Sequence, residues 1–347
     1  VAAPPGPQTF RSGRAGRVVA YLVRRVLGMV LLLFLLSIVV FFLFNLLPGD
    51  PARLTCGRAC SPATIEANRH RLGLDEPVLT QYVKFATGIF AGRTFSPDSP
   101  QPIICHAPCL GYSFNRHEQV LTLIARAAPV TFWLAIGAFI LWLFAGISLG
   151  IFAALRRGRW PDRLIMAISM IGYSLPSFFI GLVLIFFVII KWQLLPFPSY
   201  VGPFEDPVKF FQTMLLPWIV LATLNAAFYM RLTRNQVLEV LGDDYVRTAR
   251  AKGLPERVVV VKHALRAGLT PIVTAAGLDL AYLLGGAIIS ENIFSLPGLG
   301  SLSVNSVLDS DLPLITGITM LTASIIIFAN LVVDLLYAVV DPRVRIS

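Results

Sequence analysis

The sequence predicts an all-α protein that crosses a membrane several times. Of its 347 residues, 56% are hydrophobic and only 14% are charged, and the mean hydropathy is +0.74. A soluble domain would carry about 25% charged residues. The predicted architecture has six transmembrane helices, because six apolar segments are long enough to span a bilayer. They are residues 26–47, 130–154, 164–190, 214–230, 270–290 and 314–340.

The charges between these segments predict the orientation. The 155–163 loop has four Arg and one Asp, and the 231–269 loop has eight Lys or Arg and four acids. The loops near 191–213 and 291–313 together hold two Lys and five acids. Because loops rich in Lys and Arg stay in the cytoplasm, both termini are expected there. The net charge of +10 is then explained by topology, without a nucleic acid partner.

The first apolar run is too long for the core of a signal peptide and ends in Pro48-Gly49-Asp50-Pro51, which is no cleavage site. We therefore expect it to remain as a membrane helix. The expected organisation is a disordered cytoplasmic N-terminus (1–20), a first transmembrane helix (21–47), an extracytoplasmic subdomain (48–129), a five-helix core (130–340) that includes the 231–269 loop, and a cytoplasmic tail (341–347).

Within the outer subdomain, two helices are predicted. Ser61 followed by Pro62 has the pattern of an N-cap and a first helical residue, and this helix is expected to run to about Arg71. A second helix over about 77–90 places Val78, Tyr82, Phe85 and Ile89 on one face. Residues 93–109 are expected to be rich in turns.

All four cysteines lie in this subdomain, as two C-x3-C pairs: Cys56, Cys60, Cys105 and Cys109. Disulfides persist outside the cytoplasm, so disulfides are the favoured interpretation. A zinc site or free thiols are the alternatives. Four cysteines allow three connectivities, and the sequence does not choose among them.

The charged 231–269 loop contains a short predicted helix. Asp243 or Asp244 can cap it near Tyr245, and Gly253 with Pro255 ends it. Helical spacing puts Tyr245, Thr248, Ala249 and Lys252 on one face, where the small Thr248 and Ala249 would admit a partner. Arg247 and Arg250 would pair with carboxylates of that partner. The two interpretations are a docking surface for a separate protein and an ordinary cytoplasmic loop.

Catalytic motifs are missing from the sequence. It contains no G-x-x-x-x-G-K-[ST] phosphate loop, no H-E-x-x-H and no G-x-S-x-G, and its four histidines are scattered. We therefore expect no enzyme, no metal site and no cofactor in this chain.

Polar residues within the apolar segments are functional candidates, since burying them in a bilayer is costly. Asp279 is expected to line a water-filled path or to form a buried hydrogen bond between helices, and Asn225 and Glu291 are tentative path residues. Glu291 is expected at the outer boundary, in the stretch ENIFSLPGLGSL. That stretch is interpreted as a re-entrant loop or as a plain turn. Pro176 is expected to kink its helix.

Several stretches resemble one known family. ARAKG followed by HALRAG is similar to the cytoplasmic signature of ATP-binding-cassette (ABC) importer permeases. LLPGDP (46–51), RLGLDEPVLTQY (71–82), LGYSF (110–114), LPSFFIGL (175–182), RLTRNQVLEVLGDDYVRTARAKG (231–253) and ENIFSLPGLGSL (291–302) resemble the B-type permease of dipeptide/oligopeptide (nickel) importers. The resemblance covers nearly the whole chain from about residue 18, and it implies a type I ABC importer permease fold.

The resemblance implies a permease subunit for di- or oligopeptides in a bacterial inner membrane. Its implied partners are a second homologous permease, two ATPase subunits or domains that bind ATP and Mg, an extracytoplasmic substrate-binding protein and membrane lipid. Nickel chelates, haem or another small solute are alternative cargoes, and an ATP-independent channel or receptor is the alternative of another class. The implied ATPase-coupling residues are Asp244, Tyr245, Arg247, Thr248, Ala249, Lys252, Gly253 and Leu254.

The chain departs from the family pattern at three places. The general importer signature begins Glu-Ala-Ala where this chain has Arg247-Thr248-Ala249, so the acidic contact to the ATPase is expected from Asp244. The later Pro of the signature is missing at His263-Ala264-Leu265-Arg266. The four cysteines are not part of the family pattern.

Overall fold

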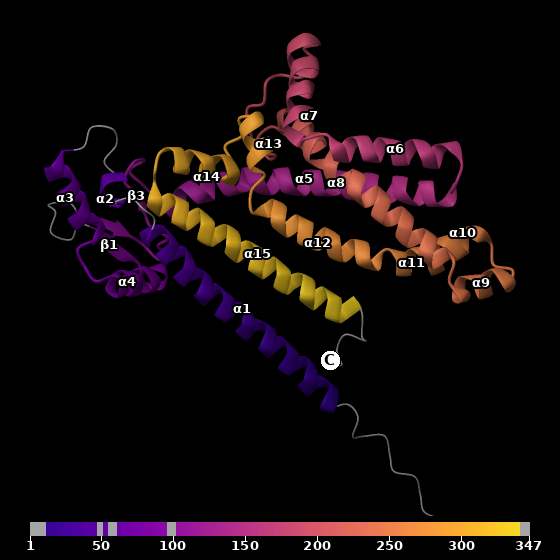
Figure 1. The fold of residues 1–347 in the computed structure, drawn as a ribbon, viewed down its shortest axis with the longest axis horizontal. Helices are drawn as coiled ribbons and strands as arrows, with labels where there is room; N and C mark the ends of the chain where they lie inside the picture. The colour runs from indigo at the N-terminus through magenta and orange to yellow at the C-terminus, as the bar shows by residue number, and fades with distance from the viewer. Residues whose placement is uncertain (1–11, 47–50, 55–60, 96–101, 341–347) are drawn as a thin grey trace, which may run out of the picture.

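The computed structural model describes residues 12–46, 51–54, 61–95 and 102–340. These residues form an elongated helical bundle with a small helix-and-strand subdomain at one end (Figure 1). The all-α membrane fold is therefore confirmed. The helices of the bundle are α1 (Ser12–Leu46), α5 (Val120–Leu155), α6 (Trp160–Ser174), α8 (Pro207–Leu241), α12 (Thr270–Leu284) and α15 (Leu312–Val340).

Four helices in the described part of the chain are long and apolar enough to cross a membrane, at Val23–Leu43, Val120–Leu155, Pro207–Leu241 and Leu312–Val332. A fifth span is counted if the bent pair of α6 and the following helices is one crossing. The sixth expected span, 270–290, is the shorter helix α12, which stops before Gly285 and is followed by α13 (Ile288–Ile293).

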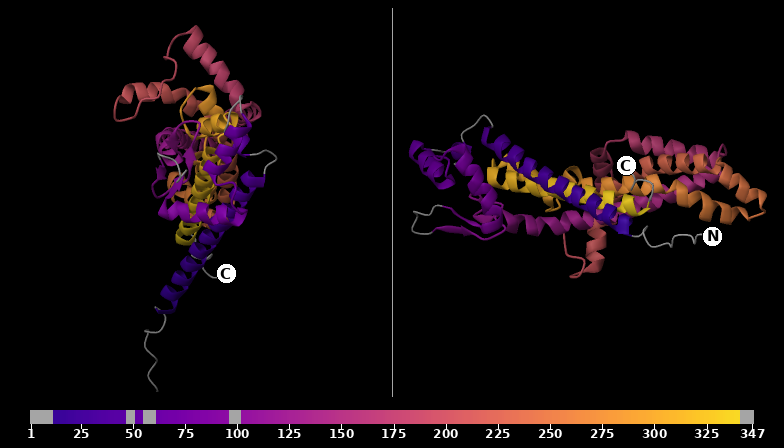
Figure 2. Two further views of the ribbon diagram at one scale, coloured as in Figure 1. Left: turned by 90° about the vertical axis from the view of Figure 1, so that its left-hand side faces the viewer. Right: turned by 90° about the horizontal axis from the view of Figure 1, so that it is seen from below.

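The expected span over 164–190 is broken at Pro176, where a kink was expected. After α6 the chain bends by 98° and continues as α7 (Ser177–Leu184) and the π-helix η1 (Ile185–Lys191). Pro176 at the bend disfavours helical backbone in the residue before it, and Leu175 has φ −84° and ψ 129°. As a result, α7 and η1 project sideways from the bundle (Figures 1 and 2).

The N-terminal segment also differs from its expectation. α1 begins at Ser12, so residues 12–20 are helical rather than disordered. Extending an existing helix costs less than starting one, which favours this continuation past the apolar run. Residues 1–11 and the expected tail at 341–347 lie outside the described residues.

α5 and α8 pack against each other along much of their length. Glycines of α5 face side chains of α8 in the pairs Gly137–Trp218, Gly146–Tyr229 and Gly150–Thr233. A Cβ atom at these glycines would lie only 2.0 to 2.6 Å from the facing side chain. Small residues thus permit the close approach of two membrane helices.

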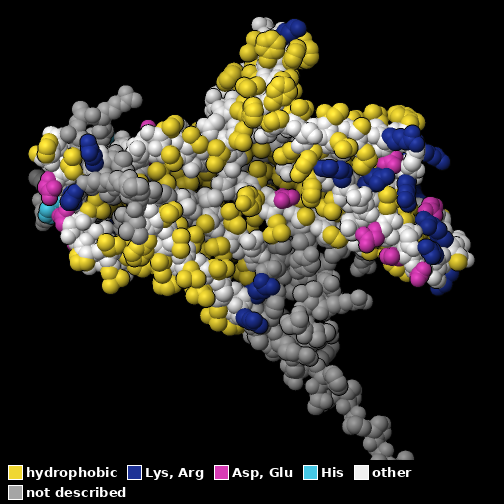
Figure 3. All heavy atoms as spheres, in the orientation of Figure 1, with side chains coloured by type: hydrophobic (Ala, Val, Ile, Leu, Met, Phe, Trp, Pro, Cys, Tyr) yellow, Lys and Arg dark blue, Asp and Glu magenta, His cyan; other side chains and the backbone are white. Residues whose placement is uncertain are grey.

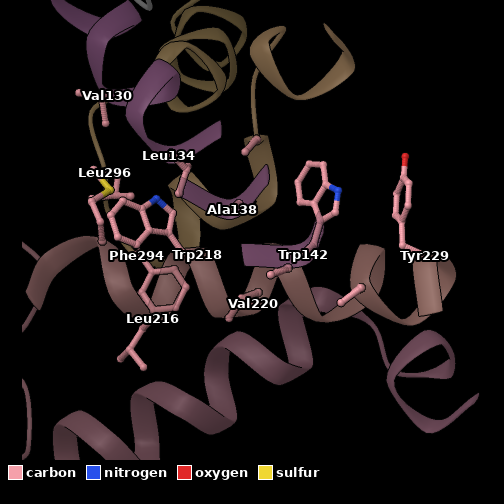
Figure 4. Close-up of a cluster of buried hydrophobic side chains, with 14 of the residues drawn as sticks. Val130, Leu134, Ala138, Trp142, Leu216, Trp218, Val220, Tyr229, Phe294 and Leu296 are labelled. Carbon is pink, nitrogen blue, oxygen red and sulfur yellow. The ribbon is translucent and has the colours of Figure 1, made fainter. Parts of the chain in front are cut away.

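The largest buried cluster lies along this helix pair (Figure 4). It includes Trp142 and Tyr229, both 0% exposed. Other members labelled in the figure are Val130, Leu134, Ala138, Leu216, Trp218, Val220, Phe294 and Leu296.

The small subdomain at one end of the bundle contains α2 (Pro51–Leu54), α3 (Pro62–Leu72) and α4 (Val78–Ala91). Both helices expected there are confirmed: the Ser61 hydroxyl accepts a hydrogen bond from the Thr64 N–H at 3.2 Å, and Gly73 ends α3 with φ +68°. Tyr82 and Phe85 of α4 pack against α1, whereas Val78 is 43% exposed and does not share this contact.

Short strands form within and just after the turn-rich stretch, and they were not expected. β1 (Arg93–Phe95) pairs antiparallel with β2 (Ile103–Cys105), and β3 (Tyr112–Ser113) pairs with β4 (Glu118–Gln119). Cys105 forms a disulfide with Cys109, which confirms that disulfide chemistry is used here. Cys56 and Cys60 lie outside the described residues. Within the described residues, no cluster suited to a metal ion is found.

At the other end of the bundle lie α9 (Asp244–Ala251), α10 (Glu256–Val258), the π-helix η2 (Val259–Ala264) and α11 (Leu265–Gly268). Lys and Arg side chains gather at this end, and hydrophobic side chains cover most of the length between the two ends (Figure 3). We call it the basic end, defined by α9–α11 and residues 156–159. In the right-hand view of Figure 2, the start of α1 and the end of α15 lie on the same half of the long axis as the basic end.

Candidate functional site

The short helix predicted in the charged loop is α9, at the basic end. Asp243 occupies the N-cap position with φ −69° and ψ 149°, but its side chain makes no capping hydrogen bond. Gly253 ends the helix with φ +78°, the left-handed region that favours glycine. Leu254 N–H donates to Ala249 O at 3.4 Å and Gly253 N–H donates to Arg250 O at 2.9 Å, which completes the turn.

Ala249 does not lie on the exposed face of α9, contrary to expectation. It is 6% exposed and packs with Val246, Val240 and Val259 in a small cluster at the basic end. The hydrophobic effect favours burial of the apolar side chains of this loop against each other. The face of α9 that carries Ala249 is therefore turned toward the cluster. Ala249 therefore fixes α9 to the end of α8 and is not available to a partner.

Arg250 also has a different role from the one expected. Its Nε and Nη2 donate to the Glu256 carboxylate at 3.1 and 2.8 Å, and its Nη1 donates to Leu241 O at 3.4 Å. This hydrogen bonding lowers the pKa of Glu256. The Arg250–Glu256 bracket spans the Gly253 turn and ties α9 to the end of α8.

The outward face of α9 keeps most of the predicted coupling residues. Thr248 is exposed and its hydroxyl donates to Asp244 O at 2.8 Å. Arg247 lies 3.6 Å from the Asp244 carboxylate in a solvent-exposed contact that contributes little stability. Partial burial, and then the Asp243 carboxylate, raise the pKa of Tyr245. The exposed members of the predicted set are Asp244, Tyr245, Arg247, Thr248, Lys252, Gly253 and Leu254.

The membrane-depth candidates separate into different environments. Asp279 of α12 is partly exposed, and its Oδ2 accepts a hydrogen bond from the Tyr229 hydroxyl at 2.5 Å. Asn225 donates to Leu221 O of its own helix at 3.3 Å. These two residues both lie on the bundle helices, but the structure assigns them different partners.

Glu291, a tentative path residue, is fully buried in this structure, with 0% exposure. Its Oε1 accepts from the Thr131 hydroxyl at 2.7 Å and its Oε2 accepts from Ser301 N–H at 2.9 Å. Thr131 in turn accepts from Leu299 N–H at 2.8 Å. The carboxylate thus satisfies the first N–H groups of α14 (Leu299–Leu308) and joins that helix to α5.

The ENIFSLPGLGSL stretch is a packed turn between α13 and α14. Phe294 and Leu296 are 0% and 1% exposed. A Cβ atom at Gly298 would lie 2.3 Å from the Glu291 carboxyl group, and one at Gly300 would lie 2.7 Å from the Ile288 backbone. The glycines give the chain room to close around Glu291.

Sequence reasoning missed one ion pair between helices. Arg234 of α8 donates to the Asp162 carboxylate of α6 at 2.6 and 2.9 Å, and Gly158 N–H donates to the same carboxylate at 2.9 Å. The sequence did carry a signal for this pair. Asp162 lies just before the apolar segment 164–190, and the oppositely charged Arg234 lies just after the next apolar segment, 214–230.

Models of known protein families match most of this chain. The family model of the inner membrane component of binding-protein-dependent transport systems matches residues 146–346, and the model of the N-terminal part of such components matches residues 18–135. The chain belongs to this family. The expected relationship to ABC importer permeases is thereby confirmed, and the chain is a membrane component of a transport system.

Relatives of this membrane component match nearly its full length. It is 36% identical over 328 residues to a putative peptide transport system permease protein of Brucella abortus (strain 2308), covering 94% of this chain and 99% of that protein. It is 38% identical over 325 residues to the glutathione transport system permease protein GsiC of Escherichia coli (strain K12), covering 94% and 98%.

One solved structure has a similar fold. A chain of the inward-facing MetNI methionine ABC transporter aligns with a TM-score of 0.50 and 19% identity, covering 64% of this chain and 97% of that chain. At this identity the likeness supports the fold of the membrane component and nothing about its cargo.

Proposed function

We propose that this chain is one permease subunit of an ATP-driven importer of di- or oligopeptides. The cargo class is supported by relatives named as peptide and glutathione permeases, since glutathione is itself a small peptide. The proposed complex contains a second homologous permease in the same inner membrane, two ABC ATPase subunits on its cytoplasmic side and an extracytoplasmic binding protein. In this complex ATP and Mg bind to the ATPases, and this chain holds no cofactor.

The proposed orientation places the basic end and both termini in the cytoplasm, because Lys and Arg are retained there. The subdomain with the Cys105–Cys109 disulfide then lies outside, where disulfides persist. α9 becomes the element that meets an ATPase.

α9 is suited to transmit motion because it is tied to the bundle at two places. The Val246–Ala249 side packs on the end of α8, and the Arg250–Glu256 bracket reaches Leu241 O. A push on the exposed face therefore moves α8, and with it α5. Closure of the ATPases would in this way drive the change between inward-open and outward-open states.

The proposal rests chiefly on one observation about α9. One face of this helix is polar and exposed, and the opposite face is packed against the end of α8. Thr248→Trp places a bulky group on that face without entering the core. A matched control is Thr87→Trp, because Thr87 is also an exposed helical threonine with a hydroxyl bonded one turn back, at Val83 O, 2.7 Å.

The test is ATPase stimulation and peptide uptake by the reconstituted complex. We expect Thr248→Trp to detach the ATPases or uncouple uptake, and Thr87→Trp to leave both unchanged. Normal coupling in the Thr248→Trp complex would refute the docking role of α9. Peptide uptake that needs no ATP would instead identify a channel.

A further inference from the structure

Asp279 lies near the middle of α12, one of the bundle helices. It is nine residues after Thr270, which corresponds to about 13 Å along the helix axis. The hydrocarbon core of a bilayer is about 30 Å thick. The carboxylate is therefore near the middle of the membrane if α12 crosses it, and Tyr229 of α8 lies at a similar depth.

No cation neutralises this carboxylate among the residues that the structure describes. The salt bridges found there do not include Asp279, whereas Asp162 of α6 is paired with Arg234. A carboxylate at membrane depth requires a cationic or polar partner, or water, to remain ionised. Asp279 is partly exposed, so a group from outside the described residues can reach it.

Tyr229 orients the carboxylate. The hydroxyl donates to Oδ2, and the tyrosine is itself fixed because its residue is 0% exposed and its Cβ packs on Gly146. The second oxygen, Oδ1, has no donor within the described part of the chain and is free to accept one.

We propose that Asp279, oriented by Tyr229, binds the alkylammonium group of the cargo during its passage through the membrane. The ammonium donates hydrogen bonds to the carboxylate, and Oδ1 is the oxygen that Tyr229 leaves without a donor. This inference rests on the proposed function, which supplies a cargo with an amine. The amine is either the N-terminus of a peptide or a lysine side chain, and the test distinguishes them.

The test measures binding to the purified complex of both permeases and the ATPases without the binding protein, so that the selectivity of that protein does not enter. The probes are alanyl-alanine amide, its N-acetylated form and N-acetyl-alanyl-lysine amide, titrated by calorimetry. We expect the free amine to bind about tenfold more tightly than the acetylated form, as one charge-assisted hydrogen bond predicts.

Asp279→Asn is expected to remove this difference while keeping the size of the side chain, and Asp279→Glu to retain part of it. Tyr229→Phe keeps the charge but loses the orienting donor, so it should reduce the difference without abolishing it. Glu239→Gln removes one negative charge from an exposed position on α8 and is the matched control, expected to match the wild type.

The lysine probe identifies the source of the amine. Binding equal to that of alanyl-alanine amide means that Asp279 accepts either amine, and binding equal to that of the acetylated form means that it accepts only the N-terminus. The proposal is overturned if the wild type does not distinguish free from acetylated peptide, or if Asp279→Asn still does. It is also overturned if Asp279→Asn fails to assemble with the second permease, because the carboxylate would then pair with that subunit.

ATP-driven uptake separates this inference from the function on which it rests. If the wild-type complex imports free and acetylated peptides equally well with ATP, only the Asp279 inference fails. If it imports no peptide at all, the proposed function itself fails.

Discussion

Arg234 of α8 and Asp162 of α6 form a two-point ion pair, with nitrogen–oxygen distances of 2.6 and 2.9 Å. The Asp162 side chain is 5% exposed and that of Arg234 is 21% exposed. The pair holds the basic end of the helix before the 98° bend against the helix that leads to α9.

Breaking this pair should destabilise the protein. Asp162→Asn leaves the Arg234 guanidinium without its counter-charge, and removing one partner of a buried pair costs about 3 kcal/mol. Thermal unfolding of the purified protein in detergent measures the effect. The double variant Asp162→Asn/Arg234→Gln should recover part of the loss, since it leaves no uncompensated charge.

An exposed ion pair provides the control. Arg126 and Glu118 are 66% and 37% exposed, and Glu118→Gln should cost at most about 1 kcal/mol. Equal losses for Glu118→Gln and Asp162→Asn would contradict the structural role of the buried pair.

Glu291→Gln should also lower stability although it preserves shape. The carboxylate accepts from both the Thr131 hydroxyl and Ser301 N–H, so an amide would face one of these donors with its own N–H groups. We expect a loss of roughly 2–3 kcal/mol in unfolding free energy. Glu205→Gln, at an exposed acid, should leave the unfolding midpoint in place. A wild-type midpoint for Glu291→Gln would show that the second carboxylate oxygen is not needed.

Gly253→Val tests the turn after α9. Gly253 has φ +78° and no atom within 4 Å of an added Cβ, so the cost is purely conformational, about 1–2 kcal/mol. Gly73, with φ +68° and equally open space, is a matched control at the opposite end. Both substitutions should lower stability by similar amounts, but only Gly253→Val should reduce ATPase coupling in the reconstituted complex. Similar coupling defects from both variants would trace the effect to general instability.

The Arg250–Glu256 bracket should weaken in acid. The guanidinium lowers the pKa of Glu256 below its ordinary value of 4.5, so folding is favoured fully above that pH and the contribution is lost as the pH falls through the folded pKa. Hydrogen exchange of the α9 amides, corrected for intrinsic rates, should show less protection as the pH is lowered from about 6 to 3. Glu256→Gln should remove this pH dependence, and an unchanged dependence in that variant would assign it to another group.

Local pattern was enough to predict the elements whose cause is local. The apolar runs predicted most of the bundle helices, Ser61-Pro62 predicted the start of α3, and Gly253-Leu254-Pro255 predicted the end of α9. The length of an apolar run has to match the thickness of the hydrocarbon core, and capping and turn residues set the ends of helices. Both features can be read from residues that are close together in the sequence.

The roles of individual polar residues depended on packing between distant segments. Ala249 and Glu291 were expected to face partners or the path, yet both are buried, because the residues around them are Val240 and Val259 in one case and Thr131 and Ser301 in the other. The sequence by itself determined the membrane fold, the family motifs and the place of the charged loop. Only the tertiary structure decided which acids are paired, because the hydrogen bonds join side chains far apart in the sequence, such as Thr131 and Glu291, which are 160 residues apart.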